Sequence, residues 1–290
     1  MIKYIPYRQI DKKRYDRCIQ KSVNSRVYAF SWYLDCVTEA WDLLVEGDYE
    51  VVMPLPRKAK YGIPYISTPS WVQQLGVFSQ QHLSERKIRE FLKAIPGKFL
   101  WIDYQLNADN QISLKSGSSK KNYLLSLQGS YKEIQNGYNK NRKRISNKAS
   151  EGLYLDKKGA IDVFIENYKK QYKPYAISEL AISQLRCLCT SNSKHVHVWN
   201  IFDNGIFRAG LVWLSDARRI TYLVPVSDEK AKQLHVSTFI INELIRDFQG
   251  QNMVLDFEGS MISGVGKFYQ SFGAQTESYI YFKKRILGHV

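Results

Sequence analysis

The residues between 195 and 226 contain three short apolar runs joined by tight turns, and this pattern restricts the possible folds most strongly. The runs cover 195–202, 206–214 and 219–226, and each has the length of a strand. The first turn contains Asn204-Gly205, a pair that tolerates the positive φ of a tight hairpin. The pattern therefore predicts an antiparallel meander of three strands.

The meander is followed by an element order typical of a layered α/β domain. Apolar residues recur at helical spacing over 241–248, and Ser237 or Thr238 can cap the start of this helix. A strand over 253–257 comes after the helix, so we expect it to pair in parallel through a right-handed crossover. A second helix around 267–272 and a final strand complete the order.

The first half of the chain echoes this order without repeating the residues. We expect a helix over 31–37, a hairpin across Gly47-Asp48, a helix over 84–95 and a strand over 99–105. The polar, turn-rich stretch 107–119 has the composition of a linker. A duplicated fold is therefore expected, with the two copies in tandem.

We place the boundary after residue 129. The first half then covers 1–129, and the second covers 130–290 and ends in a strand over 278–283. A basic, mostly helical stretch over 130–150 links the two. The fold class expected is α/β with a mixed sheet, of the α+β type, in two similar halves.

The charge balance points to an anionic partner. Lysine and arginine number 42 against 27 acidic residues, which gives a net charge of +15, and 44% of the residues are hydrophobic, enough for a core. Such an excess creates a positive potential that attracts nucleic acid, nucleotide phosphates or an anionic membrane face. It selects none of these, and a basic surface that serves only solubility is the alternative.

The sequence lacks the signals of a membrane span, a signal peptide, a metal site and two common active-site motifs. No apolar run approaches the roughly 20 residues of a membrane span, and the first residues lack the features of a signal peptide, so a cytoplasmic location with no more than peripheral membrane association is expected. The cysteines lack Cys-x-x-Cys spacing, and His195 and His197 have no third ligand nearby, so no metal site is expected. No nucleophile elbow or phosphate-binding P-loop occurs.

Three segments together resemble the GNAT-like acyltransferases related to the Fem peptidoglycan aminoacyltransferases. Those relatives carry an Asn-x-Arg-Arg type basic helix, an Asp-Phe-x-Gly strand end and a Phe-Gly-Ala type helix stop. The corresponding segments here are Asn139-Lys140-Asn141-Arg142-Lys143-Arg144, Asp256-Phe257-Glu258-Gly259 and Phe272-Gly273-Ala274. The resemblance spans most of the chain and is most specific from Tyr222 onward.

The resemblance implies two tandem GNAT-like halves, the acyl-CoA N-acyltransferase fold, and an enzyme that moves an acyl or aminoacyl group to an amine. The donor would be acyl-CoA or aminoacyl-tRNA, used as a co-substrate, with no tightly bound cofactor. The acceptor would be a small molecule or a cell-wall precursor. The oligomeric state stays open. Two alternatives also stay open: a tRNA-dependent peptidoglycan-precursor aminoacyltransferase, and a nucleic-acid-binding protein without catalytic activity.

The basic helix is a candidate polyanion site. Like charges within about two helical turns repel one another, and an anionic partner would relieve that repulsion. Arginine binds phosphate through a two-pronged fork, which suits a nucleotide or the tRNA backbone. A solvated helix face is the alternative. The candidate residues are Arg142, Lys143, Arg144 and Lys148.

The loop after the meander is the candidate donor site. In the GNAT fold this loop holds the coenzyme A pyrophosphate, and main-chain N–H groups at a helix start bind phosphate without side chains. Val236 stands where the usual motif has glycine, which weakens acetyl-CoA as the donor; Fem-type transferases also lack the glycines. The candidate donor-binding residues are Val224, Val226, Lys230, Lys232, Gln233 and Ser237.

The candidate catalytic residues are Asp256, Glu258, Lys267 and Tyr222. A carboxylate at the end of a parallel strand lies where open α/β sheets bind ligands, and Asp256 or Glu258 could accept a proton from the amine. Alternatively, Asp256 caps the following turn. Lys267 could face the donor or the developing oxyanion, and the strand backbone at Tyr222 would line the acyl site. Tyr269 departs from the Fem-type pattern, which has lysine at that position.

Overall fold

The computed structural model describes residues 1–147, 152–171, 177–259 and 261–285, which form two compact units. The first unit comprises Met1–Lys120 and the chain from Ser278 onward, and the second comprises Lys121–Glu277. The boundary expected after residue 129 thus differs from the observed division, and the strand expected to end the second half lies largely in the first unit. The two units are described separately.

The first unit contains a mixed sheet in the order β1-β2-β3-β4-β6-β13, with β5 paired to β3. Among the described strand pairs of this unit, only β4 and β6 run parallel. The strands are β1 (Ile2–Ile5), β2 (Ala40–Glu46), β3 (Val51–Lys60), β4 (Ile63–Ser67), β5 (Phe78–Ser79), β6 (Trp101–Gln105) and β13 (Gln275–Arg285). The helices are α1 (Lys12–Lys21), α2 (Ser31–Val37) and α3 (Glu85–Lys93), with short 3-10 turns η1 (Tyr7–Gln9) and η2 (Val27–Ala29).

Helices and a hairpin that local sequence patterns predicted are present in the first unit. The helix over 31–37 and the hairpin across Gly47-Asp48 are confirmed, and α3 begins after Ser84, whose side chain accepts a hydrogen bond from the Lys87 N–H. Trp41 on β2 is fully buried, with its ring 4.8 Å from that of Tyr15 on α1. Such aromatic pairs hold an amphipathic helix against a sheet.

The second unit contains the sheet order β7-β12-β11-β10-β9-β8. Its strands are β7 (Gly117–Ser126), β8 (Leu153–Asp156), β9 (Val196–Asp203), β10 (Ile206–Ser215), β11 (Arg219–Ser227) and β12 (Val254–Asp256). Its helices are α4 (Tyr131–Asn136), α5 (Lys140–Ser146), α6 (Ile161–Gln171), α7 (Glu179–Ser191), α8 (Glu229–Gln233), α9 (Val236–Phe248) and α10 (Ser263–Gln270). The predicted meander is β9-β10-β11, and β12 pairs with β11 in parallel, as expected.

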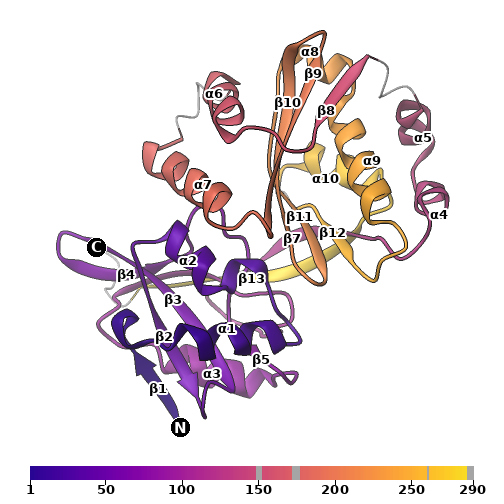
Figure 1. Ribbon diagram of the computed structural model, residues 1–290. Helices are drawn as coiled ribbons and strands as arrows, with labels where there is room; N and C mark the ends of the chain where they lie inside the picture. Colours follow the sequence, from indigo (N-terminus) through magenta and orange to yellow (C-terminus); the bar gives the residue numbers. More distant parts are fainter. Residues whose placement is uncertain (148–151, 172–176, 260, 286–290) are drawn as a thin grey trace. The chain divides into compact units, whose positions relative to one another are not determined.

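Helices cover both faces of this second sheet (Figure 1). Helices α6 and α7 lie on one face, and α9 lies on the other with α10. Close approach of α6 depends on Gly210, because a Cβ there would lie 2.7 Å from the Phe164 ring. The α9 face buries Trp199, Leu211 and Ile220 against the helix. The layer formed by α9 and α10 was expected from the sequence, whereas the layer formed by α6 and α7 was not.

Two local expectations need correction. The basic stretch over 130–150 is mostly helical where the structure describes it, as expected, but it forms two helices, since α4 ends at Asn136 and α5 begins after Asn139. Neither Ser237 nor Thr238 caps α9. His235 occupies that position with a φ of 55° and makes no capping side-chain bond, because an additional short helix, α8, precedes α9. Over the described residues, no helix combines the length and apolar character needed to cross a bilayer.

Candidate functional site

The parallel ladder between β11 and β12 ends early. In the described part of the chain it comprises three pairs, residues 219–221 with 254–256, while β11 continues to Ser227. A bulge lies at the same place: Val212 pairs with Val224 but Leu214 pairs with Thr221, which leaves an extra residue on β11. Bulges redirect main-chain groups and often lie beside active sites. The two strands therefore separate where β12 ends.

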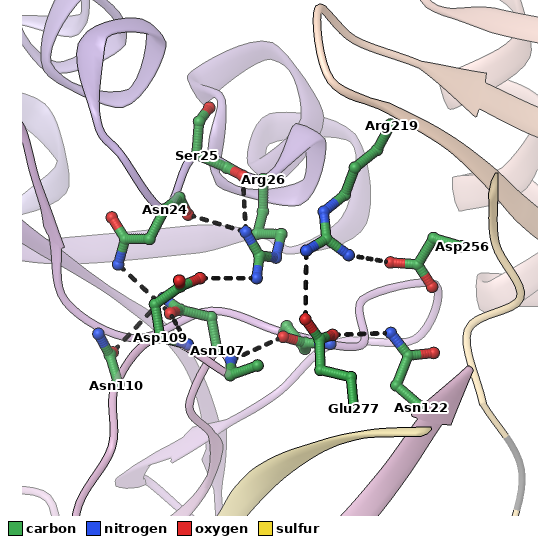
Figure 2. A network of polar contacts seen from close by, with 12 residues as sticks. Asn24, Ser25, Arg26, Asn107, Asp109, Asn110, Asn122, Arg219, Asp256 and Glu277 are labelled. Carbon is green, nitrogen blue, oxygen red and sulfur yellow. Dashed lines mark hydrogen bonds and ion pairs between the residues drawn. The ribbon is translucent and has the colours of Figure 1, made fainter. Parts of the chain in front are cut away.

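An ion-pair network holds the end of β12 (Figure 2). Arg219 Nη1 donates to Asp256 Oδ2 at 2.7 Å, and Arg219 Nη2 donates to Glu277 Oε1 at 3.3 Å. Asn122 Nδ2 donates to the other Glu277 oxygen at 3.0 Å. Burial by itself would lower the pKa of Arg219, but the charges of Asp256 and Glu277 outweigh it and raise that pKa further above its ordinary value.

This network limits what Asp256 can do chemically. The Asp256 side chain is 2% exposed, and its second oxygen accepts the N–H of Glu258 at 2.9 Å. The turn-capping interaction considered from the sequence is therefore present. The sequence alone did not indicate Arg219 and Glu277, because Arg219 lies 37 positions from Asp256 and 58 positions from Glu277. Asp256 as a proton acceptor remains a prediction.

The turn after β12 requires glycine at position 259. Glu258 and Gly259 both have positive φ, 56° and 66°. A Cβ on Gly259 would lie 2.1 Å from the Lys121 carbonyl oxygen and 2.8 Å from the Asn122 Cα. Main-chain atoms cannot give way as a flexible side chain can. The glycine therefore allows the turn to pack directly against β7.

An aromatic cluster packs where β11 and β12 separate. The Phe257 and Tyr269 rings are stacked, with centroids 4.5 Å apart, and the Tyr222 ring lies 6.1 Å from Phe257 and 6.4 Å from Tyr269. All three side chains are buried. On this face the space beside Tyr222 is thus filled by rings, and a lysine at position 269 would bury its charge among them. Packing accounts for the departure from the Fem-type pattern.

Lys267 lines a small basic pocket of about 250 Å³ in the second unit. The pocket also contains Lys121, Tyr123 and Thr276. It lies at the end of β12, because Tyr123 accepts the Phe257 N–H through its carbonyl oxygen at 3.0 Å. Within the described ranges, neither lysine forms an ion pair with a carboxylate. Two unpaired ammonium groups in one pocket suit an anion or a developing oxyanion.

A larger pocket of about 520 Å³ adjoins the basic one, and Thr276 lines both. Its walls come from β7, α4 and the start of β13, and two acidic residues, Glu133 and Glu277, line it. Glu277 also belongs to the Arg219 network. The second unit thus has an acidic pocket next to a basic one.

The candidate donor loop is divided between buried and exposed residues. Val224 and Val226 are buried, whereas Lys230 and Gln233 are exposed, and Lys232 pairs with Glu229 at 2.6 Å. Val236 is fully buried, so its side chain points into the core. Within the described chain, the N–H groups of Val236 and Ser237 have no hydrogen-bond acceptor, as is usual in a first helical turn.

Arg142 does not lie on the outer face of the basic helix. Its side chain is buried, Nε donates to Ser271 Oγ at 2.9 Å, and Nη1 donates to Thr238 Oγ1. The guanidinium lies 4.6 Å from the ring centroids of both Phe268 and Phe272. Burial lowers its pKa. Arg142 therefore joins α5 to α9 and α10.

The other three members of the predicted polyanion site differ in exposure. Lys143 is half-buried, Arg144 is exposed and Lys148 lies outside the described residues. Their role stays a prediction. His195 and His197, which raised the question of a metal, both contact Ser215. No group of His, Cys, Asp or Glu side chains suited to a metal occurs within the described ranges.

We expect Arg142→Ala to lower the free energy of unfolding by about 2 kcal/mol, because it removes two buried hydrogen bonds and leaves a cavity beside the Phe268 and Phe272 rings. Arg144→Ala, at an exposed position of the same helix, should change it by less than about 0.5 kcal/mol. Urea unfolding of both variants tests this. Equal stability of the two variants would mean that Arg142 is not part of the core.

The second unit combines a meander, a crossover helix and a parallel strand that pairs with the meander over three residues. FemX has a similar fold over the whole chain: the two chains superpose with a TM-score of 0.68 at 10% identity, over 97% of each. A tandem GNAT protein from the clavulanic acid biosynthesis pathway matches with a TM-score of 0.55 at 8% identity, over 98% of each chain. L-PGS from Bacillus licheniformis matches with a TM-score of 0.52 at 12% identity, over 97% of this chain and 93% of that one.

These likenesses establish a GNAT-like, Fem-type fold with a mixed α/β sheet. No protein-family model matches the chain, and no curated protein matches it. Because identities near a tenth carry no information on substrates, the donor and acceptor do not follow from the fold.

Proposed function

We propose that this protein is an N-acyltransferase that moves an acyl or aminoacyl group from an activated donor to an amine. The observation that carries the proposal is the early separation of β11 from β12, with a bulge in β11 at the same point. Separation of two parallel strands exposes main-chain groups at their carboxyl ends, where open α/β sheets bind ligands. Main-chain N–H groups of 222–224 would polarise the donor carbonyl.

The two adjoining pockets supply complementary charge. The basic pocket, with Lys121 and Lys267, suits the negative charge that develops on the donor carbonyl oxygen. The acidic pocket, with Glu133 and Glu277, suits a cationic amine before it attacks. Asp256 would fix Arg219 and the turn at 258–259 and thereby position both pockets. Direct attack of the amine needs only positioning and electrostatics, without a covalent enzyme intermediate.

The start of α9 is the proposed site for the donor phosphate. The Val236 and Ser237 N–H groups there have no acceptor among the described residues, and exposed Lys230 lies on the preceding helix α8, a combination that suits a phosphate of either coenzyme A or tRNA. Transfer from aminoacyl-tRNA to an amine of a cell-wall precursor is the narrower form of the proposal. The +15 charge and the extent of the likeness to FemX favour it, whereas Tyr269 replaces a cation expected for it.

The proposal is tested with purified protein, a panel of acyl-CoA thioesters and aminoacyl-tRNAs, and amine acceptors. Release of free thiol or deacylated tRNA should depend on the acceptor. Lys267→Ala should then lower kcat/KM by about 100-fold, the usual effect of removing one oxyanion contact. Lys132→Ala, an exposed position on α4, is the matched control and should have no effect. Acceptor-independent release, or none with any donor, would refute the proposal.

A further inference from the structure

One face of the first sheet presents aromatic rings to solvent. The β4–β6 register places Tyr65 beside Trp101, and the β6–β13 register pairs Trp101 with Arg285 and Gln105 with Tyr281. Residues that alternate with these, such as Ile102 and Phe282, are buried in the core. We call Tyr61, Tyr65, Trp101 and Tyr281 the aromatic strip; Tyr61 lies in the turn between β3 and β4.

The aromatic strip is accessible and preorganised. Trp101 is 42% exposed and Tyr61 is 92% exposed. The Tyr65 and Trp101 rings are stacked, with centroids 5.8 Å apart and planes 28° from parallel. Large aromatic side chains exposed side by side on a sheet are unusual in a protein with no partner for them.

Cations surround the strip. Lys60 lies 5.5 Å from the Tyr61 ring and Arg285 lies 5.3 Å from the Trp101 ring. Lys120 and Lys283 lie 5.4 Å and 4.9 Å from the Tyr281 ring.

Lys58 pairs with Tyr65 across the β3–β4 ladder. Among the residues that the structure describes, none of these five cations forms an ion pair with a carboxylate. The carboxylate on this face, Asp103, accepts the Tyr281 hydroxyl at 2.8 Å. The surface is therefore strongly positive as well as aromatic.

We propose that the aromatic strip binds single-stranded nucleic acid. Bases would stack on the Tyr65–Trp101 pair, and the lysines and Arg285 would neutralise phosphates, which is the combination found in sheet surfaces that bind single strands. The rings favour this partner over a lipid surface, because Ile63 is the sole exposed large aliphatic side chain of the described β4 and β6 strands. The proposal does not rest on the acyltransferase activity.

Fluorescence anisotropy with the full chain and a labelled oligouridine of about ten nucleotides, a length within the usual single-strand site size, tests the proposal. Trp101→Ala should weaken binding by about 10-fold, and Trp101→Phe should retain most of it, because stacking needs a ring. Lys283→Glu with Arg285→Glu should also reduce the slope of log affinity against log salt by about 1.4, for two lost phosphate contacts.

The matched control is Arg86→Glu with Lys93→Glu on α3, which makes the same charge change at exposed positions away from the strip. It should bind as the unchanged protein does, and thermal melts should show that every variant is folded. Absence of oligouridine binding would overturn the proposal, as would equal weakening by the control. Trp101-dependent binding to phosphatidylglycerol vesicles without binding to oligouridine would identify a lipid surface instead.

Discussion

Asp256→Asn should lower the free energy of unfolding by about 3 kcal/mol or more, because it leaves the charge of Arg219 buried with one partner fewer. The Arg219 side chain is 13% exposed, and Glu277 accepts from it at the longer distance of 3.3 Å. Removing one partner of a buried ion pair lowers stability by much more than the intact pair contributes to it. The remaining charge loses its opposite charge but stays buried and cannot be hydrated. Urea unfolding gives the value directly.

An exposed pair provides the control for this substitution. Asp247 binds Lys157 at 2.6 Å, with side chains 33% and 45% exposed. Asp247→Asn should therefore cost less than about 1 kcal/mol. Adding Arg219→Met to Asp256→Asn should restore part of the stability, because the unpaired charge is then gone. Loss of transfer activity with stability unchanged would instead support Asp256 as the proton acceptor.

Gly259→Ala should destabilise the second unit by at least about 3 kcal/mol. Two costs add here: a positive φ of 66° for a residue with a Cβ, and overlap of that Cβ with main-chain atoms of β7. The first cost alone is about 1–2 kcal/mol. The overlap can be relieved only by moving the turn or the strand, so ligand binding at the end of β12 should weaken as well.

Gly205→Ala separates the two costs. Gly205 has a φ of 77° in the β9–β10 hairpin, and nothing lies within 4 Å of the position of a Cβ there. This variant should show the conformational cost alone. Denaturant unfolding of both variants then isolates the steric term, and equal losses of stability would mean that the contact with Lys121 is not close in solution.

The sheet of the second unit could be predicted from local signals. The Asn204-Gly205 turn, the helical spacing over 241–248 and the short apolar run over 253–257 each act within a few residues, and all three gave the expected elements. The glycine-rich segment after Asp256 also marked the turn. Weaker patterns were missed, including β8, α6 and α7, because edge strands and covering helices depend on packing partners distant in the sequence.

The sequence by itself determined the meander, its crossover to β12 and the carboxylate at the end of that strand, since turn chemistry and hydrophobic period are local properties. Tertiary structure alone decided which charged side chains are buried and paired: Arg142 is buried against the Phe268 and Phe272 rings, and Arg219 pairs with both Asp256 and Glu277. It also gathered Tyr65, Trp101 and Tyr281 on one sheet face. The number of charged and aromatic residues does not show which of them are buried or paired, because burial and pairing depend on residues tens of positions away in the sequence.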